Sequence, residues 1–287
     1  MLVTPFLPDG ALDAPALRRQ VEHVLDCGAQ GLAVLGLAGE GTYLSLDERQ
    51  RVARVVLETA PGTPLLVGCS AEHTDDAVRL AAHAGELGAT AVMVAPPAAA
   101  GQSFAHFQAH YAAIARATAC TVMVQDAPGF LGVELGVEGV LALAAELTNV
   151  AAFKIEALPF WEHAMHIRQR VGDRLALFGG HAGLYLLDVL DSEAVGLIPG
   201  PELVRPLARA WAAYQGGERD TAQAIYRGIL PFLVFEAQSL GLLIGGAKAV
   251  LCARGILSSA HARHPRASLD STTCARLLEL AQSSDLD

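Results

Sequence analysis

The stretch Val150-Ala151-Ala152-Phe153-Lys154-Ile155-Glu156 is apolar except for one lysine and the glutamate that ends it. Similar apolar runs of five to seven residues recur along the 287-residue chain, and most end in Gly, Pro or a polar residue. Their hydrophobicity is nearly continuous rather than alternating, which is typical of parallel strands covered on both faces. Eight such strands are predicted, beginning near Leu2, Gly31, Pro64, Ala89, Thr121, Val150, Leu175 and Ala194.

Helical patterns separate the predicted strands. An apolar stripe over residues 17–25 begins after Asp13 and stops at Gly28, and Ser45 to Glu48 has the spacing of a capping box. Strands that alternate with helices predict a (β/α)8 barrel, the TIM barrel of the α/β class. A doubly wound open sheet is the rival, but it usually has fewer strands and a glycine-rich phosphate turn. The turn at 36–40 lacks the GxGxxG spacing.

After about Pro201 the pattern becomes wholly helical. Helices are predicted over residues 201–216, 218–235, 242–253 and 272–283, with a linker at 261–268. We therefore divide the chain into a barrel domain, residues 1–220, and a C-terminal helical extension, residues 221–287.

Composition excludes several classes of protein. Hydrophobic residues make up 52%, charged residues 17%, and the mean hydropathy is +0.36, which excludes an intrinsically disordered chain. A net charge of -10 argues against nucleic-acid binding. The five cysteines are scattered without a CxxC pair, so neither a disulfide framework nor a zinc finger is expected. With no signal peptide and no long apolar run, we expect no membrane association and a cytoplasmic location.

The chain holds 20 basic residues, of which only Lys154 and Lys248 are lysines. A lysine can form an imine and an arginine cannot. Lys154 lies near the carboxyl end of its predicted strand, where its amine would point into the barrel mouth and desolvation would favour the neutral, nucleophilic form. The alternative is a buried lysine that only pairs with Glu156 or Asp126. Lys248 lies on a predicted helix and is interpreted as structural.

Four features together resemble a known family: the opening LVTPF at 2–6, the Gly36-x-x-Gly39-Glu40 turn, Pro128, and Lys154 within FKIE at 153–156. Over nearly its whole length the chain resembles the dihydrodipicolinate synthase/N-acetylneuraminate lyase family. The resemblance implies that a small 2-keto acid condenses with Lys154 and that the iminium then serves as the electron sink. It also implies a homotetramer or homodimer. Because the imine replaces a metal and no metal-ligand spacing is present, we expect no metal and no cofactor.

The chain also departs from that family's pattern. The strand motif Tyr-Asn-x-Pro reads Gln125-Asp126-Ala127-Pro128, so the proton-relaying tyrosine is missing. The arginine by which the synthase binds its second substrate falls on Phe130, the usual two threonines are Leu37 and Ala38, and the usual tyrosines become residues 97–99. These losses predict a poor synthase and a poor sialic acid lyase.

One branch of the family, the 2-keto-3-deoxy-L-arabonate dehydratases, is more similar. The matching segments are VMVQDAP at 122–128, FKIE at 153–156, RHP at 263–265, and the helices around 230–231 and 247–249. Gly179-Gly180-His181-Ala182 stands where acidic residues are expected. The resemblance implies dehydration of a 2-keto-3-deoxy sugar acid. The alternatives are a pyruvate-dependent aldolase, a synthase-like enzyme, or a catalytically decayed member that binds a keto acid.

Site roles follow from the resemblance and from strand alternation. Lys154 would form the iminium, Gln125 would orient water or a hydroxyl, and Glu156 would move protons. Alternation favours Glu156 over Asp126, because it puts Glu156 in phase with Lys154 and Asp126 out of phase with Gln125. Glu40 is interpreted as a capping residue, and Glu236 and Gln238 are placed outside the site. Substrate contacts are predicted from Gly36, Leu37, Ala38, Gly39, Asp126, Gly180, His181 and Pro199.

Overall fold

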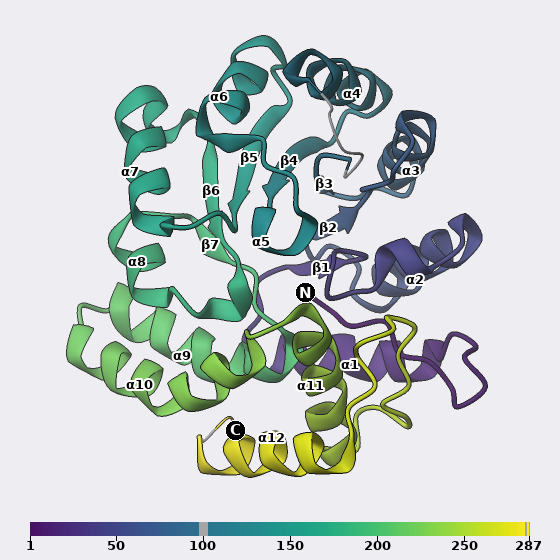
Figure 1. Ribbon diagram of the computed structural model, residues 1–287, viewed down its shortest axis with the longest axis vertical. Helices are drawn as coiled ribbons and strands as arrows, with labels where there is room; N and C mark the ends of the chain where they lie inside the picture. Colours follow the sequence, from purple (N-terminus) through teal and green to yellow (C-terminus); the bar gives the residue numbers. More distant parts are fainter. Residues whose placement is uncertain (98–102, 285, 287) are drawn as a thin grey trace.

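A single parallel sheet forms the centre of the molecule (Figure 1). The computed structural model describes residues 1–97, 103–284 and 286. Its seven strands neighbour one another in chain order, and every pairing is parallel. They are β1 (Leu32–Val34), β2 (Leu65–Gly68), β3 (Ala91–Val94), β4 (Thr121–Asp126), β5 (Val150–Ile155), β6 (Ala176–Gly179) and β7 (Gly196–Leu197).

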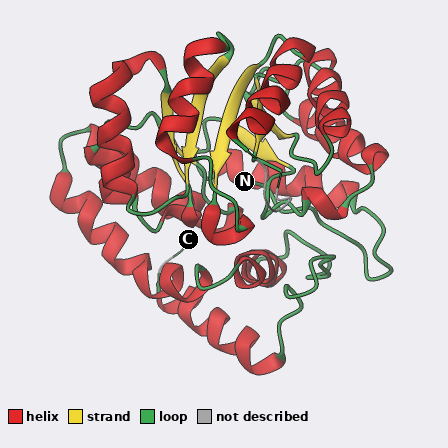
Figure 2. Cartoon of the chain, turned by 45° about the horizontal axis from the view of Figure 1, so that its top comes forward, coloured by secondary structure: helices red, strands yellow, loops and turns green. Residues whose placement is uncertain are grey.

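Helices follow the strands and surround the sheet (Figure 2). Those of the strand–helix repeat are α1 (Ala14–Asp26), α2 (Leu46–Thr59), α3 (Thr74–Glu86), α4 (Phe104–Ala117), α5 (Pro128–Leu131), α6 (Gly136–Glu146), α7 (Phe160–Val171) and α8 (Leu186–Asp191). The predicted helix starts are confirmed: Asp13 caps α1, and Ser45 and Glu48 form both hydrogen bonds of the capping box of α2. None of the helices in the described part of the chain has the length and apolar character needed to cross a membrane.

The first predicted strand, at residues 2–6, is wrong as a strand. Leu2 donates its N–H to the carbonyl of Ala33 in β1 at 2.7 Å, and the amine of Met1 donates to the carbonyl of Pro199 just after β7. The segment thus fills the gap between the first and last strands. Pro5 has no N–H for a ladder, and the chain then turns away, with Phe6 pairing antiparallel to Leu12. The lysine strand is therefore β5.

A layer of apolar side chains fills the inside of the curled sheet. Ala33, Leu66, Met93, Met123 and Ala152, from five successive strands, form a buried cluster of their own, and Phe178 and Ile198 pack against it. Side chains alternate between the two faces of a strand. The residues two places after Met123 and Ala152 therefore face inward again, one layer nearer the carboxyl ends of the strands.

The chain after β7 is helical, as predicted. It begins with the short 3-10 turn η4 (Pro201–Leu203) and continues with α9 (Val204–Gln215), α10 (Arg219–Glu236), α11 (Leu240–Ala253) and α12 (Ser271–Ser283). These helices share a second hydrophobic cluster that includes Leu207, Phe232 and Leu277. The division at residues 220 and 221 lies at the beginning of α10 and remains a prediction.

A buried ion pair ties this helical part to the ring. Lys248 of α11 donates to a carboxylate oxygen of Glu40, and both side chains are fully buried. The other Glu40 oxygen accepts the N–H groups of Arg263 at 2.6 Å and His264 at 2.8 Å. The ring of Phe6 has the Lys248 ammonium and the Arg263 guanidinium each 4.5 Å from its centroid. Glu40 therefore holds backbone, and Lys248 has a structural position.

Glu40→Gln should destabilise the fold by roughly 3–5 kcal/mol, because it leaves the buried Lys248 ammonium without its counter-ion. The matched control is Glu279→Gln, which removes one partner of the exposed Arg276–Glu279 pair and should cost at most about 1 kcal/mol. Urea denaturation followed by circular dichroism measures both. Equal losses in the two variants would contradict the structural role assigned to the buried pair.

Candidate active site

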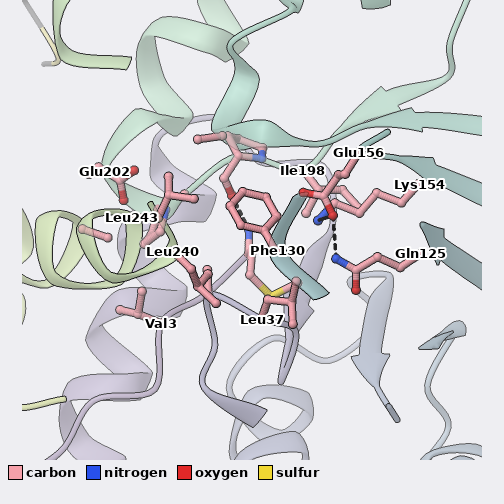
Figure 3. A pocket seen from close by; sticks show the side chains of 17 residues that line it. Val3, Leu37, Gln125, Phe130, Lys154, Glu156, Ile198, Glu202, Leu240 and Leu243 are labelled. Carbon is pink, nitrogen blue, oxygen red and sulfur yellow. Dashed lines mark hydrogen bonds and ion pairs between the residues drawn. The ribbon is translucent and has the colours of Figure 1, made fainter. Parts of the chain in front are cut away.

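A pocket opens at the carboxyl ends of β4 and β5, and segments from distant parts of the chain line it (Figure 3). Gln125, Lys154 and Glu156 come from the central strands, and Leu37 and Ala38 come from the turn after β1. Other lining residues lie after β7 and on α11. The carboxyl end of a parallel barrel is where catalytic groups gather in this architecture.

The register of β4 and β5 places two of these side chains side by side. Gln125 pairs with Lys154, one layer above Met123 and Ala152, and Asp126 pairs with Ile155 on the outer face. Since Glu156 is two residues beyond Lys154, it continues along the inner face. The structure therefore has Glu156 on the same face as Lys154 and Asp126 on the opposite face, as strand alternation predicted.

The Glu156 carboxylate is the centre of the site. Its Oε2 lies 3.1 Å from the Lys154 amine and accepts the Gln125 side-chain N–H at 2.6 Å. Its Oε1 accepts the backbone N–H of His181 at 3.2 Å. The Lys154 and Glu156 side chains are 7% and 6% exposed, so this ion pair lies almost out of water.

At Glu156, charge and hydrogen bonding counteract the effect of burial on the pKa of the carboxyl. Burial alone would raise the pKa of the Glu156 carboxyl, but the Lys154 charge, the Gln125 amide and His181 together hold that pKa below its ordinary value. The group is therefore an anion at neutral pH. A carboxylate at this distance from Lys154 can balance the charge of an iminium and can accept a proton from an adjacent carbon.

The Gly179-Gly180-His181 segment packs against the Glu156 carboxylate. A Cβ on Gly180 would lie 2.2 Å from Cγ of Glu156, so only glycine leaves room for the carboxylate. The His181 ring packs between Phe130 and Tyr185, and burial lowers its pKa. The structure thus brings His181 to the site through its backbone N–H.

The turn after β1 presents backbone to the pocket. In the described part of the chain, the N–H groups of Leu37, Ala38 and Gly39 donate to no protein acceptor, and Leu37 and Ala38 line the pocket. A Cβ on Gly39 would lie 2.9 Å from the N of Leu35, and one on Gly36 would lie 2.4 Å from Cε of Met1. These glycines allow the tight turn, and its free N–H groups suit a carboxylate.

Asp126 does not join the site, which corrects its predicted substrate contact. Its two carboxylate oxygens accept the N–H groups of Leu135 at 3.0 Å and Gly136 at 2.9 Å, so it holds the loop that begins α6. It is fully buried on the outer face of β4. Pro199 does line the pocket. Of the residues 97–99, Ala98 and Ala99 lie outside the described residues.

The sequence analysis missed a pair of buried carboxyl groups. Glu202 in η4 lines the pocket. Glu236, at the end of α10, interacts with Glu202, although the sequence pattern placed Glu236 outside the site. Burial raises the pKa of Glu202 to about 7 and that of Glu236 well above its ordinary value. A glutamate just after the last strand was the one available signal for Glu202, and no local pattern links it to Glu236.

No set of three or more His, Cys, Asp and Glu side chains within the described residues is arranged to hold a metal ion. The five cysteines are free thiols. The chemical groups that this pocket offers are therefore an amine, carboxyl groups, an amide and backbone N–H groups.

Comparisons with known proteins identify the family of the chain. The L-2-keto-3-deoxyarabonate dehydratase of Azospirillum brasilense is 32% identical over 98% of this chain and 92% of its own length. A 4-hydroxy-tetrahydrodipicolinate synthase of Bifidobacterium longum is 31% identical over 94% of this chain and 88% of its own length. The crystal structure of dihydrodipicolinate synthase from Rhodopseudomonas palustris superposes with a TM-score of 0.90 at 27% identity, covering 98% and 95% of the two chains. The model of the dihydrodipicolinate synthetase family matches residues 1–283, and the chain belongs to that family.

Proposed function

We propose that this protein is a Schiff-base lyase that dehydrates a 2-keto-3-deoxy sugar acid resembling 2-keto-3-deoxy-L-arabonate. The observation that carries the proposal is the buried Lys154 amine, 3.1 Å from the Glu156 carboxylate in a pocket of a lyase family. The 32% identity to the Azospirillum brasilense dehydratase over 98% of the chain supports this substrate class.

Substrate binding would begin at the turn after β1. The carboxylate of the keto acid accepts the N–H groups of Leu37, Ala38 and Gly39, which brings its C2 carbonyl toward Lys154. The Lys154 ammonium gives up a proton, its amine adds to C2, and loss of water gives the iminium. Glu156 then lies opposite a permanent positive charge in a site almost free of water, where their attraction is strong.

Elimination would follow through the enamine. The iminium acidifies C3, and Glu156 accepts a C3 proton. The enamine electrons then expel the C4 hydroxyl, which takes up a proton and leaves as water. Gln125 holds the Glu156 carboxylate by its N–H at 2.6 Å and does not titrate. Proton shifts and hydrolysis of the imine release the product and restore Lys154.

Retro-aldol cleavage is the second candidate reaction, and it makes a different demand. It requires a base at the C4 hydroxyl, the position that the family resemblance assigns to a tyrosine. Gln125 has no proton-accepting pKa, so cleavage loses its base while elimination keeps Glu156. Synthase activity is less favoured still, because Phe130 lines the pocket where the resemblance implies an arginine. A decayed member that only binds a keto acid is the remaining alternative.

The remaining expectations are part of the same proposal. The partner is a small 2-keto acid, and the protein acts as a homotetramer or homodimer in the cytoplasm. No metal or cofactor is assigned to the reaction, because the imine supplies the electron sink.

The imine can be tested directly. Pyruvate and borohydride should attach one pyruvate-derived group to the peptide that contains Lys154. Lys154→Ala should abolish the label, because the amine is the nucleophile. Lys248→Ala is the matched control and should keep the label if it folds, since Lys248 belongs to the buried pair with Glu40. Mass spectrometry locates the adduct, and a label that persists in Lys154→Ala would refute the mechanism.

Glu156→Gln should lower kcat for dehydration by about 10²–10⁴-fold, the usual contribution of a general base. The variant keeps the size of the side chain but cannot accept the C3 proton. Glu134→Gln, on the loop before α6, is the control and should change kcat little. Exchange of C3 protons of bound pyruvate into deuterated water should slow in parallel. Unchanged exchange in Glu156→Gln would assign the proton transfer to another group.

Analysis of the products distinguishes dehydration from cleavage. With 2-keto-3-deoxy-L-arabonate and its stereoisomers, dehydration should give 2-oxoglutarate semialdehyde, whereas cleavage should give pyruvate and glycolaldehyde. We expect dehydration to exceed cleavage by at least about 10²-fold, because only cleavage lacks its base. Pyruvate as the main product would make the protein an aldolase. Rapid condensation of pyruvate with aspartate semialdehyde would make it a synthase.

A further inference from the structure

The pocket has a second polar end, formed by Glu202. This side chain is 1% exposed and lines the pocket, and Figure 3 shows it across the pocket from Lys154 and Glu156. Its Oε2 accepts no N–H or hydroxyl group from the described part of the chain. A buried carboxyl oxygen without a donor is costly, and it is relieved when a ligand supplies the donor.

Glu236 lies behind Glu202. Both oxygens of Glu236 are also buried and receive no N–H or hydroxyl donor from the described residues. A hydrogen bond joins the two carboxyl groups, which requires that they share a proton, and the Glu202 carboxyl also accepts its own backbone N–H. The nearest partner of the Glu202 carboxyl is thus a second acid, although the Arg254 charge also acts on it.

Cationic groups are scarce around this end of the pocket. Among the described residues that line the pocket, Lys154 supplies the one cationic side chain, and it is paired with Glu156. The Met1 amine donates to the carbonyl of Pro199, and burial and the Lys154 charge lower its pKa to about 5, so it is neutral at pH 7. Arg254 donates to the backbone carbonyl of Glu202 at 3.0 Å, and its charge lowers the pKa of the Glu202 carboxyl less than burial raises it.

We propose that Glu202 is a specificity-determining residue, which accepts a hydrogen bond from an uncharged hydroxyl at the end of the substrate remote from C2 and excludes 2-keto acids with a second carboxylate there. This inference rests on the proposed function for the identity of the C2 end. A hydroxyl supplies the missing donor to the Glu202 carboxyl. A carboxylate supplies none, finds no unpaired cation, and adds a like charge to a buried acid pair.

Gly200 sets the position of the Glu202 carboxyl. A Cβ on Gly200 would lie 2.1 Å from Oε1 and 2.6 Å from Oε2 of Glu202. The Gly200 backbone, with φ -69° and ψ 159°, is ordinary for alanine, so Gly200→Ala must displace the carboxyl rather than strain the chain. This variant therefore moves Glu202 without removing it.

The test compares two five-carbon keto acids that have no C4 hydroxyl and so cannot be dehydrated: 5-hydroxy-2-oxopentanoate and 2-oxoglutarate. Isothermal titration at pH 8 measures their affinities. Wild type should bind the hydroxy acid at least about tenfold more tightly. Glu202→Gln should reduce this ratio to below about threefold, mainly because 2-oxoglutarate binds better. Gly200→Ala should reduce it too, whereas Gly228→Ala, with no neighbour within 4 Å on α10, should leave it unchanged.

Equal binding of the two acids by wild type, or an unchanged ratio in folded Glu202→Gln, would overturn the inference. Thermal melts establish that each variant is folded. Borohydride trapping of pyruvate on the same samples reports the imine separately, because pyruvate has no remote end. Discrimination that depends on Glu202 without a trapped adduct would leave this inference intact and refute the Schiff base. A trapped adduct without discrimination between the two acids would support the Schiff base and refute this inference.

Discussion

The in-register pairing of β4 with β5 is the constraint on which the site depends. Parallel strands with both faces covered must place alternate side chains inside the ring, and the pairing of Gln125 with Lys154 puts an amide beside an amine. The layer beneath, with Met123 and Ala152, is filled with apolar atoms and excludes water from below. The position of the Lys154 amine therefore follows from sheet packing and does not depend on a loop.

Glu156 is the residue that the other polar groups of the site contact. One carboxylate contacts the amine, the Gln125 amide and the His181 N–H, so β4, β5 and the turn after β6 converge on a single group. Gly180 is the steric counterpart, because its missing Cβ is the space in which the Glu156 carboxyl lies. Gln125 supplies a fixed N–H donor and has no titrating group, so the titrating group in contact with the Lys154 amine is Glu156.

Periodicity was sufficient to predict the parts that depend on local pattern. It located the strand of Lys154, the choice of Glu156 over Asp126, the caps of α1 and α2, and the late helices. It could not show that residues 2–6 make too few ladder bonds to form a strand, because that depends on Pro5 and on the turn at Phe6. It also missed Glu202 and Glu236, which are far apart in sequence and meet only through the packing of α10 against the region after β7.

The distribution of charge in the pocket distinguishes its two ends. Near Lys154 the carboxylate of Glu156 has a cation and two N–H donors, so it is stable as an anion. Near Glu202 two carboxyl groups lie together, and burial outweighs the Arg254 charge and favours a shared proton. In the proposed function, the first end stabilises the iminium and the second end meets a neutral polar group of the substrate. A substrate that satisfies both has a keto acid at one terminus and a hydroxyl at the other, which is the pattern of a keto-deoxy sugar monoacid.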